Sequence, residues 1–160
     1  MYKNSIIKSA KGIVVVKNKY LLQLRDNKKN VYYPNFWGLF GGGLNENETH
    51  KKCLEREINE ETNLLVKATK DILSVNFNMI NLKKKRQISY YICEILKKTK
   101  IILTEGQKYK FFSYNQIKKI NIVPMDFVAI NSHYYKIMKY TSQNHWAILT
   151  KKCLKWKKNN

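Results

Sequence analysis

The sequence predicts an α/β fold, a layered domain in which helices pack on a β-sheet. Segments rich in β-branched and aromatic residues alternate along the chain with segments rich in long polar residues. The chain has 160 residues, a length that suits one domain with one substantial core. No internal repeat and no Gly/Ser-rich or Pro-rich linker divides it. We therefore expect a single domain over residues 1–160.

The first elements expected are two short strands and a helix. Residues 12–25, GIVVVKNKYLLQLR, carry two apolar runs around a Lys-Asn pair, the pattern of two strands joined by a turn. An aromatic loop follows and ends in glycines 41–43, where a backbone needs unusual dihedral angles or a close approach. Residues 49–63 predict a helix of about four turns. Thr49 is its expected N-cap, and Asn63 can take the left-handed conformation that ends a helix.

The remaining elements follow from shorter apolar and aromatic runs. Strands are expected at residues 71–80, 86–96, 100–104 and 108–113, with Lys-rich connections between them. Helices are expected at 114–120, 125–138 and 142–156, the last of them within a basic helical tail at about 138–158.

Composition excludes several classes of protein. No apolar run approaches the roughly 18–20 residues that a membrane span needs, and the first residues lack the pattern of a signal peptide. Cys53, Cys93 and Cys153 are widely spaced and form no C-x-x-C pair, which argues against a disulfide framework or a zinc knuckle. We expect a cytoplasmic protein without a membrane partner.

The formal net charge of +20 has two explanations. Lysine-rich runs at 83–86, 97–100 and 151–158 could contact a nucleic-acid backbone. The runs are scattered along the chain and are not gathered on one predicted element, which favours a solvated lysine coat in a chain rich in Lys, Asn and Ile.

Acidic residues, by contrast, are concentrated in one segment. Six of the eleven lie between Glu46 and Glu61. On a helix, Glu57, Glu60 and Glu61 share a face, so three like charges repel one another unless a partner relieves them. Neighbouring Lys or Arg side chains could do so, as could a hard divalent cation, which prefers oxygen ligands. A solvated acidic face is the simpler alternative, but the shortage of acid elsewhere and the glycine cluster upstream favour a metal.

Residues 42–64 resemble the Nudix box, G-x5-E-x7-R-E-U-x-E-E-x-G-U, in which U is a bulky apolar residue. Gly42 and Glu48 match the first fixed positions, and the stretch from Arg56 to Leu64, REINEETNL, matches the others with one exception. The exception is Asn63 in place of glycine, a mild change because Asn tolerates positive φ. Just before the box, Phe40 stands where many members carry proline.

The resemblance covers about residues 10–135, because residues 12–25 and 103–117 also resemble their counterparts in MutT-like members. It implies a Nudix-type α/β/α sandwich around a mixed, partly curled β-sheet. It further implies a Mg²⁺-dependent hydrolase, with Mn²⁺ possible, that cleaves a diphosphate linkage in a nucleoside diphosphate derivative. A nucleoside triphosphate, a nucleotide sugar and a dinucleotide all qualify, since the box builds the metal site and leaves the rest of the substrate to loops.

The resemblance assigns roles to individual residues. Glu57, Glu60 and Glu61 would bind the metal with the backbone carbonyl of Gly41. Glu105, from the later loop, would add a further carboxylate near the metal. Glu61 or Glu105 would take the proton of the attacking water, and the sequence does not separate the two.

Other residues are expected to support the reaction or bind substrate. Arg56, in the catalytic site, would orient the carboxylates by a bidentate pair. Glu48 would have a structural or outer-shell role at the metal. Gly42 is expected at the substrate, and Arg25 could reach a substrate phosphate or be an ordinary surface arginine. Tyr33 or Phe36 could stack on a base, whereas Trp37 is expected in the core.

Two alternatives differ in substrate or in activity. The charge of +20 would suit an RNA 5′-end pyrophosphohydrolase, a decapping-type enzyme whose affinity falls steeply with salt. A non-catalytic nucleotide sensor is the other, although such domains commonly lose ligand glutamates that this chain keeps. Monomer and homodimer are both compatible with the sequence.

Overall fold

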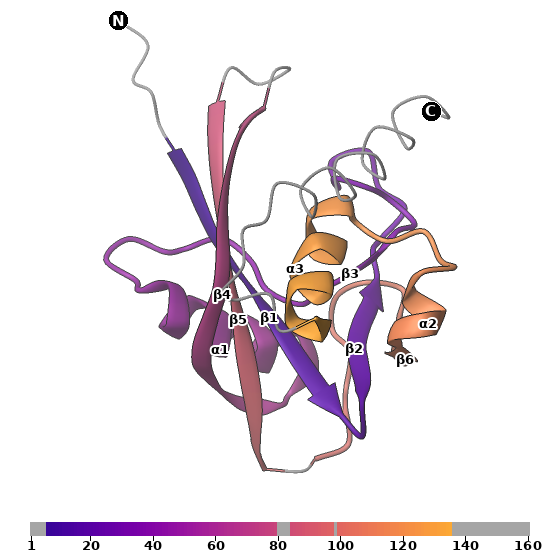
Figure 1. Ribbon diagram of the computed structural model, residues 1–160. Coiled ribbons are helices and arrows are strands. Elements are labelled where there is room, and N and C mark those ends of the chain that lie inside the picture. Colours follow the sequence, from indigo (N-terminus) through magenta and orange to yellow (C-terminus); the bar gives the residue numbers. More distant parts are fainter. Residues whose placement is uncertain (1–5, 80–83, 98, 136–160) are drawn as a thin grey trace, which may run out of the picture.

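A six-stranded mixed β-sheet with helices on both faces forms the fold (Figure 1). The computed structural model describes residues 6–79, 84–97 and 99–135; the expected helical tail at about 138–158 lies outside these ranges. The elements are β1 (Ile6–Val16), β2 (Lys19–Leu24), β3 (Trp37–Gly38), α1 (His50–Thr62), β4 (Leu65–Met79), β5 (Lys84–Lys97), β6 (Lys108–Ser113), α2 (Tyr114–Ile117) and α3 (Pro124–Tyr134). The predicted α/β class is confirmed.

The sheet is mixed, as the resemblance implied. Its strand order is β3-β2-β1-β5-β4, and β6 pairs with β2. Strands β1 and β5 run parallel, whereas the β1–β2, β2–β3, β2–β6 and β4–β5 pairs are antiparallel. The strand β1 pairs with β5 over Ile6–Val14 and with β2 only through Val15 and Val16. Because β1 changes partner along its length, the sheet curls without closing.

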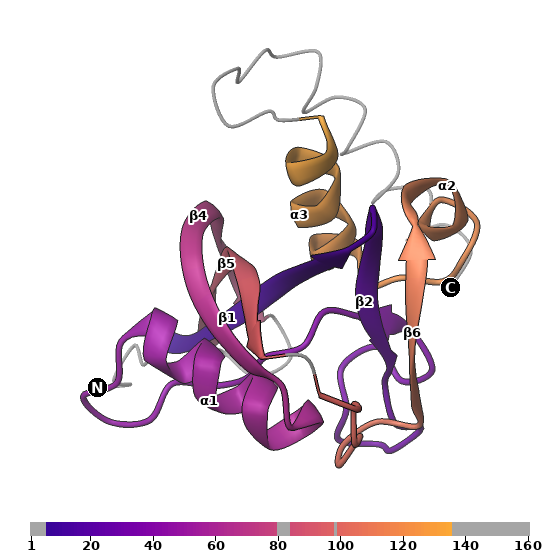
Figure 2. The same ribbon diagram turned by 90° about the horizontal axis from the view of Figure 1, so that it is seen from below.

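Two hydrophobic cores lie on the two faces of this sheet. Adjacent residues of one strand enter different cores, as Leu21 and Leu22 do on β2, because strand side chains alternate in direction. One core includes Leu54 and Ile58 of α1, and the other includes Ile130 of α3. Figure 2 shows α1 and α3 on opposite sides of the strands, the arrangement of an α/β/α sandwich.

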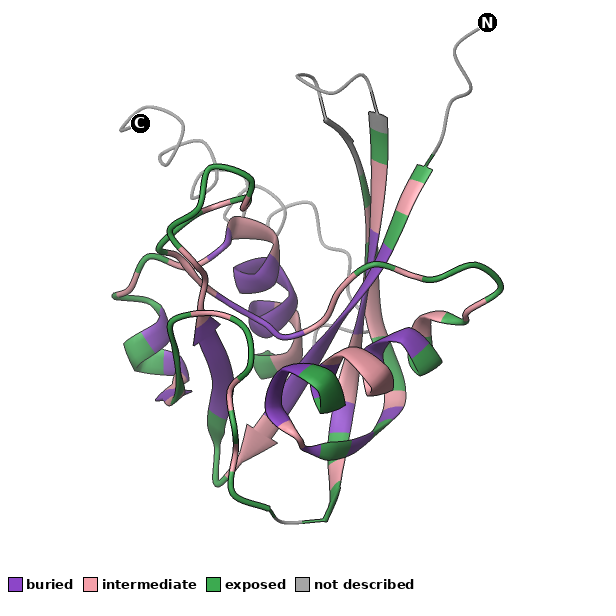
Figure 3. Cartoon of the chain, turned by 180° about the vertical axis from the view of Figure 1, so that it is seen from behind, coloured by how far each residue is buried: buried purple, intermediate pink, exposed green. Residues whose placement is uncertain are grey.

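The helix α1 begins and ends where its caps predict. The Thr49 hydroxyl accepts a hydrogen bond from the Lys52 N–H, and Asn63 takes φ 55° at the other end. Leu54 and Ile58 are fully buried and hold the helix on the sheet. Figure 3 shows buried and exposed residues alternating along α1, which lies against the strands.

The strand predicted at 100–104 is wrong, because those residues bind the end of α1 instead. The Ile102 N–H donates to Thr62 O and to Asn63 Oδ1, and the Thr104 N–H donates to Glu61 O. The last carbonyls of a helix have no partner within the helix. The segment supplies donors to them and so has no need of a neighbouring strand.

Gly41 lies directly against β1, at a place where only glycine fits. Its φ is +127°, and an added Cβ would lie 2.2 Å from Ala10 O. On either side of it the Ala10 and Gly12 N–H groups donate to the carbonyls of Gly42 and Phe40. The glycine loop is therefore fastened to the central strand of the sheet.

Gly41→Ala is expected to destabilise the protein by more than about 2 kcal/mol, through backbone strain and steric overlap. The control is Gly43→Ala, since an added Cβ there meets nothing nearer than Lys8 O at 4.0 Å. Urea unfolding of the two variants measures the difference. Equal stability of both would show that the close contact at Gly41 is not a real constraint.

Candidate active site

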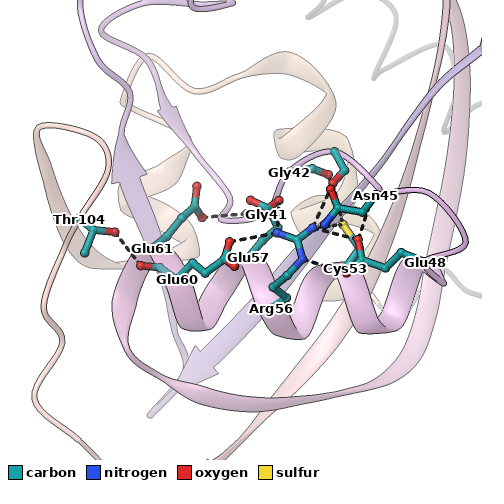
Figure 4. Close-up of polar contacts among 11 residues, drawn as sticks. Gly41, Gly42, Asn45, Glu48, Cys53, Arg56, Glu57, Glu60, Glu61 and Thr104 are labelled. Atoms are coloured by element: carbon teal, nitrogen blue, oxygen red, sulfur yellow. Dashed lines mark hydrogen bonds and ion pairs between the residues drawn. The ribbon is translucent and has the colours of Figure 1, made fainter.

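The glycine loop and the acidic face of α1 form the candidate site (Figure 4). The Glu57 carboxylate lies against the backbone of Gly42, where an added Cβ would be 2.3 Å from Glu57 Oε2. The loop thus leaves room for the carboxylate because residue 42 carries no side chain. The site joins two segments that the sequence had placed next to each other in the Nudix box.

Arg56 lies at the centre of the acidic face and relieves its repulsion. Its guanidinium binds Glu48 through two bonds of 2.9 Å, Nε to Oε1 and Nη2 to Oε2. Its Nη1 donates to Glu57 Oε1 at 2.8 Å and to Glu60 Oε2 at 3.0 Å. Three carboxylates thus share one guanidinium, and the orienting role expected of Arg56 in catalysis stays a prediction.

Glu48 anchors this arginine to the loop. Besides binding Arg56, its Oε2 accepts a hydrogen bond from the Asn45 N–H at 3.0 Å. The Arg56 hydrogen bonds and this backbone bond lower the pKa of Glu48 to about 2. Glu48 is thus an ionised partner that anchors Arg56 to the loop, and its expected outer role at a metal stays a prediction.

Glu61 is the buried carboxylate of the site. Its side chain turns away from Arg56 and accepts from the Gly41 N–H at 3.1 Å and from Gln23 Nε2 at 3.4 Å. The residue is only 6% exposed. Burial raises the pKa of Glu61 to about 7, although both hydrogen bonds act in the opposite direction.

The loop between β5 and β6 reaches the acidic face of α1. Thr104 Oγ1 donates to Glu60 O at 2.6 Å, and an added Cβ at Gly106 would lie 2.7 Å from Gln23 Oε1. Between them Glu105 is exposed, and its charge contributes to the raised pKa of Glu61. The structure therefore brings Glu105 into the neighbourhood of the acidic face.

Of the residues predicted at the substrate, Gly42 lies in the glycine loop, and Arg25, Tyr33 and Phe36 lie in the segment 25–36. Arg25 Nε donates to Tyr32 O at 2.7 Å, which ties this arginine to the loop. Tyr33 and Phe36 face each other with ring centroids 5.5 Å apart. Trp37 packs on Phe112 with centroids 4.6 Å apart, as expected of a core residue. Contacts of these residues with substrate stay predictions.

The donor set of the acidic face fits a hard divalent cation. Glu57, Glu60 and Glu61 place carboxylate oxygens within about one helical turn, and the glycine loop beside them carries backbone oxygens. Within the described ranges no three His, Cys, Asp or Glu side chains already converge on one metal position. The hydrogen bonds explain this, because Arg56 holds Glu57 and Glu60 while Gly41 holds Glu61.

Sequence reasoning missed two residues that bind the acidic part of α1. Gln23 is a buried polar residue on β2 that binds Glu61, and Thr104 binds the α1 backbone at Glu60. A glutamine between apolar strand residues was a usable signal for the first. Nothing local marks Thr104, which lies 44 residues from its partner.

Comparisons with known proteins identify the family of the chain. The family model described as the NUDIX domain matches residues 7–131. A search of curated proteins gave no match. Among solved structures, a MutT protein from Methanosarcina mazei Go1 is similar, with a TM-score of 0.71, 22% identity, and coverage of 88% of this chain and all of that one.

Two further structures share the fold at low identity. An E. coli dihydroneopterin triphosphate pyrophosphohydrolase has a TM-score of 0.61 and 18% identity, over 78% of this chain and 92% of that one. A bifunctional NMN adenylyltransferase/ADP ribose pyrophosphatase from Francisella tularensis, solved with AMP and a Mn ion, has a TM-score of 0.60 and 18% identity, over 87% and 44%.

The chain belongs to the NUDIX domain family, because the family model spans most of its length. It is a Nudix hydrolase, an enzyme that acts on pyrophosphate bonds. Within the described ranges, no helix has both the length and the apolar character that crossing a bilayer requires.

Glu61→Gln is expected to stabilise the metal-free protein at neutral and alkaline pH. The pKa of the Glu61 carboxyl is about 7 in the folded protein, against an ordinary value of 4.5. Its contribution to stability is therefore fully present below pH 4.5 and is lost as the pH rises through 7. Because the Gln amide carries no charge, the variant avoids a loss of up to about 3 kcal/mol in the free energy of unfolding. Urea unfolding in EDTA from pH 5 to 8 measures the growing difference.

The control is Glu60→Gln, whose side chain is 59% exposed and which should change stability by less than about 1 kcal/mol at every pH. If Glu61→Gln lowers the free energy of unfolding at pH 8 as much as at pH 5, burial does not disfavour the charged form of Glu61.

Proposed function

We propose that this protein is a Mg²⁺-dependent pyrophosphohydrolase, with Mn²⁺ as a possible substitute, that cleaves a diphosphate linkage in a nucleoside diphosphate derivative. The observation that carries the proposal is the acidic face of α1, where Glu57 and Glu60 share one guanidinium and Glu61 is buried beside the glycine loop. In a chain of charge +20, such an arrangement suits a site for a metal and a phosphate chain.

The proposed ligands of the metal are Glu57, Glu60, Glu61, Glu105 and the carbonyl of Gly41. The bound cation would neutralise phosphate charge and lower the pKa of a coordinated water. The F. tularensis structure with its Mn ion supports a divalent metal for the fold. Arg56 holds Glu57 and Glu60 by 2.8 and 3.0 Å bonds, which fixes both carboxylates in direction before any cation arrives.

The proton of the attacking water would pass to Glu61 or Glu105. The Glu61 carboxylate accepts hydrogen bonds from the Gly41 N–H and from Gln23, and these two bonds fix its orientation. Glu105 is exposed and near the same place. Carboxylates around one metal ion titrate as a set, so both stay candidates for the base.

The substrate is proposed to be a small nucleotide derivative. Gly42 and Arg25 are the proposed contacts to its phosphates, and Tyr33 or Phe36 the proposed platform for its base. Residues 1–160 are proposed to act as one Nudix domain, as a monomer or a homodimer. The cysteine pattern supports a cytoplasmic location as part of this proposal.

A second candidate is an RNA 5′-end pyrophosphohydrolase. The observation that favours it is a pair of exposed lysines on β6, Lys108 and Lys110, which lie 6.0 Å from the centre of the Trp37 ring and 5.3 Å from that of the buried Phe112 ring. Exposed lysines suit the phosphate backbone of a nucleic acid.

A phosphate-release screen distinguishes these substrates. Nucleoside triphosphates, dinucleotides, nucleotide sugars and 5′-triphosphate RNA are tested with Mg²⁺ or Mn²⁺. On the best substrate, Glu57→Gln, Glu60→Gln and Glu61→Gln are each expected to lower kcat/KM by about 100-fold or more. RNA should be turned over less well at high salt if RNA is the substrate.

Glu55→Gln is the matched control on the same helix. Its carboxylate accepts from the Ala68 N–H at 2.8 Å, on the side of α1 that meets β4. We expect a change in kcat/KM of less than about threefold, because the amide keeps an acceptor oxygen. Parental activity in Glu60→Gln and Glu61→Gln would refute the site.

A further inference from the structure

The strand β4 has an outer edge that the proposed mechanism does not use. It is the last strand at one end of the sheet, and within the described part of the chain β5 is the one strand that pairs with it (Figure 2). An edge strand presents backbone N–H and C=O groups that can pair with another chain. Proteins usually protect such an edge with charged side chains, bulges or a covering helix.

The first half of the β4 edge is protected in this way. The Ala68 N–H donates to Glu55 Oε1 at 2.8 Å, and Thr69 O accepts from Lys51 Nζ at 2.9 Å, so side chains of α1 bind this part of the backbone. The pairing with β5 is also irregular between Ala68 and Leu73. Such bulges bend a strand and discourage further pairing.

The second half, residues 73–79, has none of these protections. Its pairing with β5 is regular from Leu73 opposite Tyr90 to Met79 opposite Lys84. Among the described residues, none outside β5 forms a hydrogen bond with the backbone of this segment. Alternate residues of a strand direct their backbone groups to the same side. About half of these residues therefore offer N–H and C=O groups to a partner.

The sequence of the segment also lacks the residues that blunt an edge. Residues 73–79 read LSVNFNM and contain no charged residue, Pro or Gly, in a chain that is 26% charged. By contrast β6, an edge strand that pairs with β2, carries exposed Lys108 and Lys110, and lysines on an edge discourage pairing. The β4 edge thus lacks the positive charges that would keep two copies of this protein apart.

The polar and apolar residues of the segment alternate symmetrically about Asn76. Ser74 and Asn76 are exposed, whereas Leu73 and Val75 are half-buried against the core on the α3 side of the sheet. Antiparallel pairing of two copies centred on Asn76 places Val75 opposite Phe77. Every apolar residue of the segment then faces an apolar residue of the other copy, and every polar residue faces a polar one. A two-fold axis makes this edge its own complement.

We propose that residues 73–79 form a homodimer interface, in which the β4 strands of two copies pair antiparallel about a two-fold axis at Asn76. The two sheets then become one continuous sheet. A second copy suits the edge because a neutral surface avoids the repulsion between two chains of charge +20. A nucleic acid or an acidic protein would be attracted by lysines, which this edge lacks. The paired strip is narrow, so we expect a weak dimer with a micromolar dissociation constant.

The proposed interface lies away from the acidic face of α1. Glu55 and Lys51 are on the side of α1 that meets β4, whereas Glu61 binds Gly41 and Gln23. The dimer therefore leaves the candidate active site open and does not depend on the proposed function. Loss of the dimer should change kcat/KM by less than about twofold, so either proposal can fail without the other.

Sedimentation velocity of the full chain between about 1 and 300 μM tests the dimer. We expect the mass to rise toward twice the 19.1 kDa of one chain. The rise should occur at lower protein concentration in about 0.5 M NaCl than in about 0.05 M, because salt screens the repulsion between the two copies. A mass that stays at one chain throughout would overturn the proposal.

Asn76→Lys places two lysines opposite each other at the proposed axis and should weaken the dimer by about fivefold or more. Asn115→Lys is the matched control, because it makes the same change at an exposed residue of α2. It should change the dissociation constant by less than about twofold. A 1:1 mixture of Asn76→Lys and Asn76→Glu should recover the parental affinity, because opposite charges then face each other.

Equal weakening by Asn76→Lys and Asn115→Lys would show that the copies meet at another surface and would overturn the proposal. So would a mixture that dimerises no better than Asn76→Lys alone. The far-UV circular dichroism spectrum reports whether each variant is folded.

Hydrogen exchange locates the interface in the unmodified protein. We expect outward-facing amides of residues 73–79 to exchange at least about fivefold more slowly at 300 μM than at 1 μM, while the amides of β6 keep their rates. If residues 73–79 are already protected at the lowest concentration, another segment of the same chain covers the edge and the proposal is wrong. It is equally wrong if the slowing appears only elsewhere.

Discussion

Like charge held together on one helix is the constraint on which the rest of the site depends. Three glutamates within one turn of α1 repel one another, and the fold offsets this in two ways. Arg56 gathers Glu48, Glu57 and Glu60 on its guanidinium, while Glu61 is buried against the glycine loop. Burial raises the pKa of Glu61, so its charged form is unfavourable in the metal-free protein. A bound cation would stabilise that charged form.

The sheet supplies the rigid support for this arrangement. The glycine loop is fastened to β1 by backbone hydrogen bonds, and α1 is fastened to the same sheet by Leu54 and Ile58. Loop and helix therefore keep a fixed separation, in which residue 42 has to be glycine to leave space for Glu57. The preference of the family for glycine in this loop follows here from contact distances.

Much of the site could be predicted from sequence because its parts are local. The helix, its two caps and the sharing of a face by Glu57, Glu60 and Glu61 need only helical geometry. The contacts of residues 102–104 with the end of α1 could not be predicted, since an apolar run is also typical of a strand and the unpaired carbonyls that it meets are 40 residues away. The Lys11–Asp126 pair was missed for the same reason, because it depends on how the sheet and α3 come together.

Binding of Mn²⁺ to the protein without substrate tests the central claim most directly. Electron paramagnetic resonance of free Mn²⁺ measures the affinity, and we expect Glu57→Gln and Glu60→Gln each to weaken it by about tenfold or more. Glu94→Gln, at an exposed glutamate of β5, should leave it unchanged. Equal affinity in all four proteins would mean that the acidic face of α1 is not where the cation binds.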